Sequence, residues 1–174
     1  MKVISASELA VKTRVIIFGC NNVGKTLAKL ASIGGFDVTI ADQRSEVLAD
    51  LQSFGIDTIC DKYENAVKLT NINKDSFVVV ATPGHEFDKE TVEWVLPYKP
   101  QYIGVMGSSS KVESFKNYWK EKGGNHEQVE NIFMPIGLKL GSKTHEEIAI
   151  EILAQIVSVK NEAQRIYLNC PSKN

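Results

Sequence analysis

Residues 14–42 read RVIIFGCNNVGKTLAKLASIGGFDVTIAD, and the rest of the chain is organised around this stretch. The stretch opens with an apolar run, 15–18, whose lack of polar alternation favours a strand covered on both faces. A glycine-containing turn, a helical pattern and a second apolar strand follow, and Asp42 ends that strand. Strand, glycine turn, helix, strand and acid in this order predict a dinucleotide-binding βαβ unit.

The turn differs from the usual glycine fingerprint at its middle position. Gly19 and Gly24 stand where the first and third glycines are expected, whereas Asn21 replaces the second. The first glycine makes the tight turn, and the third lets helix and strand approach closely. The middle glycine leaves room for a pyrophosphate, so Asn21 puts a side chain where the ligand would press. The helix that begins near Asn22 and Val23 offers free N–H groups to a phosphate. The predicted nucleotide contacts of the turn are Gly19, Asn21, Asn22, Val23 and Gly24.

The composition excludes several classes of protein. The chain has 174 residues, of which 43% are hydrophobic and 24% charged, and its net charge is −1. This balance predicts one globular domain with no general attraction to nucleic acid or to anionic membranes. No run reaches the roughly 20 apolar residues of a membrane span, and the first residues lack a signal peptide's apolar core. We therefore expect a cytoplasmic protein. The three cysteines show no CxxC spacing, so no metal site is predicted.

Further strands and helices alternate along the chain and predict a Rossmann-like, doubly wound α/β domain with a mostly parallel sheet. We expect an N-terminal arm over 1–13, the domain over 14–160 and a tail over 161–174. The later strands are expected at 57–60, 77–81, 102–106 and 132–134. Two capping-box spacings, Ser110 with Glu113 and Thr144 with Glu147, predict the starts of the last two helices.

Ligands in such folds bind beyond the carboxyl ends of the strands, and three further groups of residues follow predicted strands. Asp42 is placed to bond both hydroxyls of a ribose, or else to serve as a turn acid or helix cap. Arg44 complicates this assignment because an arginine nearby can accept a 2′-phosphate instead. Both alternatives stay open.

Thr82, His85 and Asp88 follow the strand at 77–81. His85 is a candidate acid, base or ligand clamp, and Asp88 follows close behind it in the chain. The alternative is that His85 simply begins the next helix and that Asp88 caps this helix or lies in its first turn. Gly107, Ser108 and Lys111 follow the next strand and are typical of a loop that accepts a phosphate or carboxylate, although capping of the helix explains the serines equally well. Cys20 is interpreted as a small filler behind the glycine turn rather than as a reactive thiol.

Five segments of the chain resemble the Rossmann domain of the XdhC/CoxI family. The resemblance runs from Arg14 to Val157 and rests on FGCNNVG, VTIADQR, VVVATPGHEFD, YIGVMGSSSK and PIGLKLGSKTHEEIAIEI. The positions that match the family are Gly19, Gly24, Asp42, Thr82, His85, Asp88, Gly107, Ser108, Lys111, Gly137 and Gly141. The resemblance implies an accessory factor for a molybdenum hydroxylase of the xanthine dehydrogenase type. Such a factor binds the molybdopterin cofactor, helps its sulfuration and hands it to the apoenzyme, which makes a sulfurtransferase a second expected partner.

The chain departs from the family pattern in several places. Family members carry glycine in place of Asn21, a histidine–acid pair in place of Pro83 and Gly84, and arginines in place of Ser109 and Ser110. The N-terminal domain of longer members is expected to be absent. We therefore expect a cofactor-binding accessory protein, or chaperone, rather than an enzyme.

Two alternatives to this function stay open, an NAD(P)-dependent oxidoreductase and a nucleotide-sensing regulatory domain. The last helix carries apolar residues beyond one narrow stripe, among them Ile150, Leu153 and Val157. Either the domain core or a partner in a homodimer would cover them.

Overall fold

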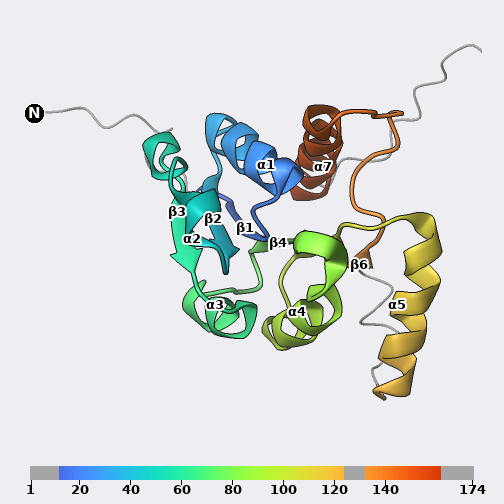
Figure 1. Ribbon diagram of the computed structural model, residues 1–174. Coiled ribbons are helices and arrows are strands. Elements are labelled where there is room, and N and C mark those ends of the chain that lie inside the picture. Colours follow the sequence, from blue (N-terminus) through green and yellow to red (C-terminus); the bar gives the residue numbers. More distant parts are fainter. Residues whose placement is uncertain (1–11, 124–131, 162–174) are drawn as a thin grey trace, which may run out of the picture.

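The computed structural model describes residues 12–123 and 132–161, in which a parallel sheet of six strands is covered by helices on both faces (Figure 1). The strand order is β3-β2-β1-β4-β5-β6, and each neighbouring pair is parallel. The strands are β1 (Arg14–Phe18), β2 (Asp37–Asp42), β3 (Asp57–Cys60), β4 (Phe77–Val80), β5 (Tyr102–Val105) and β6 (Ile132–Phe133). The predicted Rossmann-like α/β fold is confirmed. Most of the predicted arm and tail lies outside the described residues.

The order of the strands reverses between β1 and β4. From β1 the chain proceeds outward to β2 and β3, and it then returns to the other side of β1 to form β4 and β5. Such a reversal is the point at which open α/β sheets bind ligands, because the loops after the two central strands part there. The glycine turn after β1 and the loop after β4 therefore flank the switch point.

Alternate side chains of the strands supply two separate hydrophobic cores. Val15 and Ile17 of β1 belong to the core under α1 and α7, whereas Ile16 and Phe18 belong to the core on the other face. Figure 1 shows α1 and α7 above the sheet and α3 and α4 below it. This arrangement explains the uninterrupted apolar run in β1, since both of its faces are buried. The helices are α1 (Asn22–Ile33), α2 (Ser45–Leu48), α3 (Tyr63–Leu69), α4 (Asp88–Val95), α5 (Ser109–Glu121) and α7 (His145–Lys160), with short 3-10 turns η2 (Gln52–Phe54), η3 (Pro83–His85) and η4 (Leu96–Tyr98).

Helix α7 begins at the predicted capping box and packs along α1. The Thr144 hydroxyl accepts from the Glu147 N–H at 3.2 Å, and the Glu147 carboxylate accepts from the Thr144 N–H at 3.0 Å. Leu153 packs against the core, while Ile150 is 50% exposed and Val157 39%. The core therefore covers only part of the apolar surface of α7, and the homodimer stays a prediction. No helix within 12–123 and 132–161 combines the length and the apolar character that crossing a membrane requires.

Helix α5 starts differently from the prediction. Its N-cap is Ser108 rather than Ser110, and the Ser110 hydroxyl lies 2.8 Å from the Ser108 hydroxyl. The predicted capping box at Ser110 is therefore wrong, because that residue already lies inside the first turn. Phe115 and Trp119 of this helix are buried.

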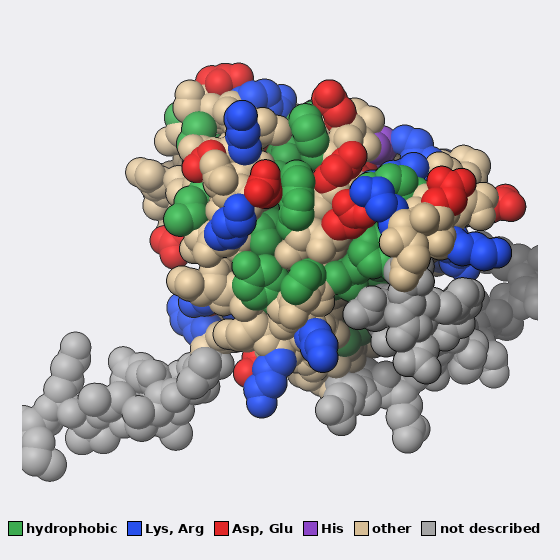
Figure 2. All heavy atoms as spheres, turned by 90° about the horizontal axis from the view of Figure 1, so that it is seen from below, with side chains coloured by type: hydrophobic (Ala, Val, Ile, Leu, Met, Phe, Trp, Pro, Cys, Tyr) green, Lys and Arg blue, Asp and Glu red, His purple; other side chains and the backbone are tan. Residues whose placement is uncertain are grey.

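Figure 2 views the molecule from the side of α3 and α4 and shows hydrophobic side chains gathered near the centre of this face, with charged side chains around them. Leu69 at the end of α3 and Tyr98 in η4 are among the exposed large hydrophobic residues of the chain. Exposed apolar surface is thus present on both helical layers, since Ile150 and Val157 belong to the opposite one.

Candidate functional site

The turn after β1 brings three backbone segments into very close approach. Gly19 has a φ of +111°, and a β-carbon at this position would lie 2.1 Å from the carbonyl oxygen of Ala81, just beyond β4. A β-carbon at Gly24 would lie 2.2 Å from the carbonyl oxygen of Gly19. Only glycine fits at either position, because any side chain would have to displace backbone. The two glycines of the predicted fingerprint thus have the tight-turn and close-packing surroundings that their roles require.

Asn21 is the N-cap of α1, and both ends of its amide are engaged. Its Oδ1 accepts from the Gly24 N–H at 2.9 Å, and its Nδ2 donates to the Ala81 carbonyl at 3.0 Å. The side chain therefore caps the helix and ties the turn to the end of β4. Within the described residues, the N–H groups of Asn22 and Val23 have no acceptor. They are the backbone donors that α1 can offer to a phosphate.

Asp42 ends β2 but turns its carboxylate inward, and its side chain is only 1% exposed. Its Oδ1 accepts from the backbone N–H and the Nε of Arg44, at 3.0 and 2.9 Å. Its Oδ2 accepts from the Cys20 N–H at 2.7 Å, from Arg44 Nη2 at 3.0 Å and from the Tyr63 hydroxyl at 3.4 Å. Burial favours the neutral acid, but the hydrogen bonds from Arg44 and Cys20 outweigh it and lower the pKa of Asp42. Asp42, for which a ribose contact and a role as turn acid or helix cap were both open, thus has its oxygens occupied by the chain itself.

Cys20 packs behind the turn. The residue is 3% exposed, and its thiol donates to the carbonyl of Val47 at 3.2 Å. Burial, with the nearby charge of Asp42, raises the pKa of Cys20 to about 11. A thiol in this state is a poor nucleophile at neutral pH, which favours the interpretation as a filler.

The loop after β4 holds a histidine in a fixed orientation. His85 Nδ1 lies 2.8 Å from Asp88 Oδ2, while Asp88 Oδ1 accepts from the Thr82 N–H at 3.0 Å and from the Thr82 hydroxyl at 2.6 Å. Thr82 and Asp88 are buried, and the His85 side chain is 32% exposed. The φ of His85 is +61°, a conformation that costs a non-glycine residue about 1–2 kcal/mol. An acid that holds one ring nitrogen leaves the other, Nε2, for a ligand or proton. The arrangement suits a ligand clamp or an acid–base group.

The loop after β5 is more open. Ser108 and Lys111 are exposed, and the Lys111 N–H donates to the Ser108 carbonyl at 2.9 Å. A β-carbon at Gly107 would lie 2.9 Å from the methyl group of Met134, so this glycine admits the segment that follows β6. Lys111 belongs to the first turn of α5 and has an exposed cation there.

The structure brings several of these residues together at the carboxyl ends of β1, β2 and β4. The bond from Asn21 to Ala81 joins the glycine turn to the loop of Thr82, and the bond from Cys20 to Asp42 joins it to β2. The loop of Ser108 and Lys111 follows β5, the next strand of the sheet. Tyr63, which contacts Asp42, was missed from the sequence. Its position directly after β3, the neighbour of β2, is the signal that places it there.

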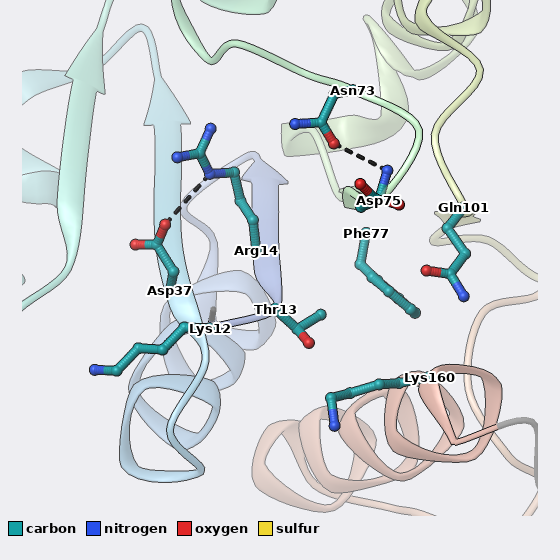
Figure 3. Close-up of a pocket in the computed structure, with 9 residues that line it drawn as sticks. All are labelled: Lys12, Thr13, Arg14, Asp37, Asn73, Asp75, Phe77, Gln101 and Lys160. Atoms are coloured by element: carbon teal, nitrogen blue, oxygen red, sulfur yellow. Dashed lines mark hydrogen bonds and ion pairs between the residues drawn. The ribbon is translucent and has the colours of Figure 1, made fainter. Parts of the chain in front are cut away.

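A hollow of about 820 Å³ lies at the other ends of the strands, the amino ends (Figure 3). Arg14, Asp37 and Phe77 begin β1, β2 and β4, so this hollow faces the amino ends of the strands. Arg14 and Asp37, which face each other on the adjacent strands β1 and β2, pair at 3.3 Å in its lining. Ligands of this fold bind at the carboxyl ends, so the strand-end loops remain the candidate site despite the size of the hollow. The hollow is lined by Lys12, Thr13, Arg14, Asp37, Asn73, Asp75, Phe77, Gln101 and Lys160.

Across the described part of the chain, no three His, Cys, Asp or Glu side chains gather as metal ligands.

Comparison with known families identifies the domain. The family model described as the XdhC Rossmann domain matches residues 15–156, which include all of the strand-end loops above. The chain belongs to the XdhC family.

Two curated relatives of the XdhC-type chain are longer than it is. It is 31% identical over 155 residues to YqeB of Escherichia coli K12, covering 87% of this chain and 28% of YqeB. It is 26% identical over 150 residues to a protein of Bacillus subtilis 168 named as a probable subunit of xanthine dehydrogenase, covering 86% of this chain and 43% of that protein. The chain thus spans less than half the length of these relatives.

Solved structures share the fold of the chain. The chain superposes on a crystal structure of a xanthine dehydrogenase from Bacillus halodurans with a TM-score of 0.75 and 26% identity, over 90% of this chain and 45% of that one. An imine reductase of Myxococcus stipitatus, in complex with NAD+, matches with a TM-score of 0.50 and 16% identity over 66% of this chain and 39% of its own. The second likeness shows the fold alone.

Proposed function

We propose that this XdhC-type domain is an accessory and maturation factor for a molybdenum hydroxylase of the xanthine dehydrogenase type. In this role it binds a molybdopterin or another nucleotide-containing cofactor at the carboxyl ends of β1, β2, β4 and β5. The observation that carries the proposal is the match of the XdhC Rossmann domain over residues 15–156. The Bacillus subtilis relative, whose name refers to xanthine dehydrogenase, supports the type of partner.

The residues at the strand ends fit the phosphate-bearing part of such a cofactor. The N–H groups of Asn22 and Val23 and the exposed cation of Lys111 are donors suited to phosphate oxygens. His85, held by Asp88, offers Nε2 as a further contact from the loop after β4. The fit is poor at Asp42, whose oxygens are occupied. The cofactor would supply molybdenum to the hydroxylase, and these side chains would hold and orient it until transfer.

Deletion of the gene tests the proposal. A strain without the protein should produce hydroxylase polypeptide with little activity, because the apoenzyme lacks its mature cofactor. The wild-type gene should restore activity, and a Lys111→Ala variant should restore it less well than Lys116→Ala, a control on the same helix. Normal hydroxylase activity in the deletion strain would refute the proposal. A cytoplasmic location and a sulfurtransferase partner remain predictions.

The His85–Asp88 pair favours one alternative, an NAD(P)-dependent oxidoreductase, because a histidine oriented by a buried acid is a common acid–base group. Turnover of a reduced nicotinamide with a panel of small carbonyl compounds would support this alternative. Turnover that survives in His85→Ala would rule out a role for the pair in that chemistry.

A further inference from the structure

We propose that the end of β2 receives a phosphate group of the bound ligand, through Arg44, rather than a free ribose diol. The inference rests on the proposed function in one respect, namely that the strand ends bind a phosphate-containing cofactor. It names the chemistry that this part of the site accepts.

Asp42 has no capacity left for a ribose. A carboxylate offers about four lone-pair positions, and five donors already point at the two oxygens of Asp42. A ribose diol would bring two more donors, and each would have to displace a donor of the chain. Three of the five come from Arg44, which is bound in the strong fork geometry of an arginine–carboxylate pair. The acid is also 1% exposed, so a sugar hydroxyl could reach it only after Arg44 had moved away.

Arg44 is the part of this pair that meets the solvent. Its side chain is 42% exposed, while that of Asp42 is buried. A guanidinium has five N–H donors, and Nε and Nη2 each use one on Asp42. Within the described residues the remaining three find no acceptor. The hydrogen bonds to Asp42 raise the pKa of Arg44 further, so its charge is permanent. A ligand approaching the end of β2 therefore encounters a cation first.

Asp42 also fixes the direction of that cation. Arginine loses less entropy per bond than a free lysine when its planar fork is already held, and here the carboxylate holds it from behind. The same carboxylate accepts the Cys20 N–H, which ties Arg44 to the glycine turn and hence to the start of α1. The free N–H groups of Asn22 and Val23 and the guanidinium of Arg44 thus flank one turn. Two phosphate groups of one ligand, or a phosphate and a second anionic group, suit these two sets of donors.

Two kinds of ligand share this chemistry, a nucleotide with a phosphate on its ribose and a cofactor that ends in a phosphate monoester. NADP+ and NAD+ differ only in the 2′-phosphate, and inorganic phosphate represents the monoester. We would measure binding of all three to the full chain by calorimetry. Charge-assisted hydrogen bonds predict that NADP+ binds on the order of tenfold or more tightly than NAD+ if the ribose carries the phosphate. Binding of inorganic phosphate that depends on Arg44, without a preference for NADP+, indicates the monoester.

Variants separate this role from a structural one. Arg44→Ala should abolish the preference or the phosphate binding, and Arg44→Lys should retain part of it, because a point charge remains without the fork. Lys68→Ala removes a cation of α3 that is paired with Glu64 and serves as the control. Thermal unfolding of each variant would establish that it is folded. The inference is overturned if NAD+ binds as tightly as NADP+ and phosphate binding does not depend on Arg44, or if none of the three probes binds. A hydroxylase defect in the deletion strain would stand in either case, so the proposed function is judged separately.

Discussion

The backbone of Gly19 passes so close to the end of β4 that no side chain fits between them. We predict that Gly19→Ala lowers the free energy of unfolding by more than about 3 kcal/mol, because the new methyl group meets the Ala81 carbonyl and the φ of +111° is unfavourable. Gly35→Ala is the matched control, since its φ is +84° but nothing lies within 4 Å of the added carbon. It should cost about 1–2 kcal/mol, the strain of a positive φ alone. Urea denaturation measures both, and equal losses would contradict the close approach.

The side chain of Asp42 gives the stability of the protein a specific dependence on pH. An aspartate in the unfolded chain titrates near 3.9, and in the folded chain hydrogen bonds from Arg44 and Cys20 overcome the effect of burial and lower the pKa. The stabilisation is therefore fully present above pH about 4 and is lost as the pH falls through the lower folded value. The difference in unfolding free energy between wild type and Asp42→Asn should be constant at neutral pH and shrink on acidification. A difference that does not depend on pH would contradict the assignment.

The same residue marks the boundary of what the sequence predicts about the site. The acid at the end of the second strand and the arginine two residues later are visible in the sequence, and both functions remained open there. Whether Asp42 faces a ligand or the protein depends on the path of the chain from 42 to 44 and on Tyr63, which arrives from another element. No local pattern encodes such a contact. The positions of Thr82, His85 and Asp88 were predictable, but their hydrogen bonds to one another were not.

Glu151 of helix α7 holds the loop that precedes this helix. Glu151 Oε1 accepts from the N–H groups of Leu140 and Ser142, at 2.8 and 3.1 Å, and Oε2 accepts from the Ser142 hydroxyl at 2.8 Å. We predict that Glu151→Ala speeds hydrogen exchange most at the amide of Ser142, which loses its acceptor, and less at that of Leu140, which keeps the Leu138 carbonyl at 3.1 Å. Glu151→Gln retains one carbonyl oxygen and should give an intermediate rate. Unchanged exchange in the alanine variant would show that the loop is held by other contacts.

The two capping boxes show why element boundaries are predicted unevenly. Thr144 and Glu147 form the predicted box. Before α5 there are three consecutive serines, and the helix starts early enough that Ser108 stands at the N-cap position, without a side-chain capping bond, while Ser110 bonds to Ser108. The bounds of the strands were predicted more closely than the start of α5, because the apolar runs of the strands identify them without any capping residue. β3 agrees with its predicted range residue for residue.

The order of the strands gathers the candidate site at the carboxyl ends of the sheet. The order β3-β2-β1-β4-β5-β6 brings the glycine turn, Asp42 with Arg44, the His85 loop and the Lys111 loop to the carboxyl ends of adjacent strands. The hollow at the amino ends of the strands could not be predicted from the sequence, because it depends on how the starts of the strands and the end of α7 assemble. The fold follows from the alternation of strands and helices, whereas the use of the site that we propose rests on the XdhC family relationship.

Mass spectrometry of the purified protein under non-denaturing conditions tests the central proposal most directly. The protein should be isolated from a host that makes molybdopterin, together with Lys111→Ala and the Lys116→Ala control. We predict that the wild-type protein and the control carry a pterin that contains phosphate, and that the Lys111→Ala variant carries less. Wild-type protein that contains no pterin, in cells with an active molybdenum hydroxylase, would contradict the proposal.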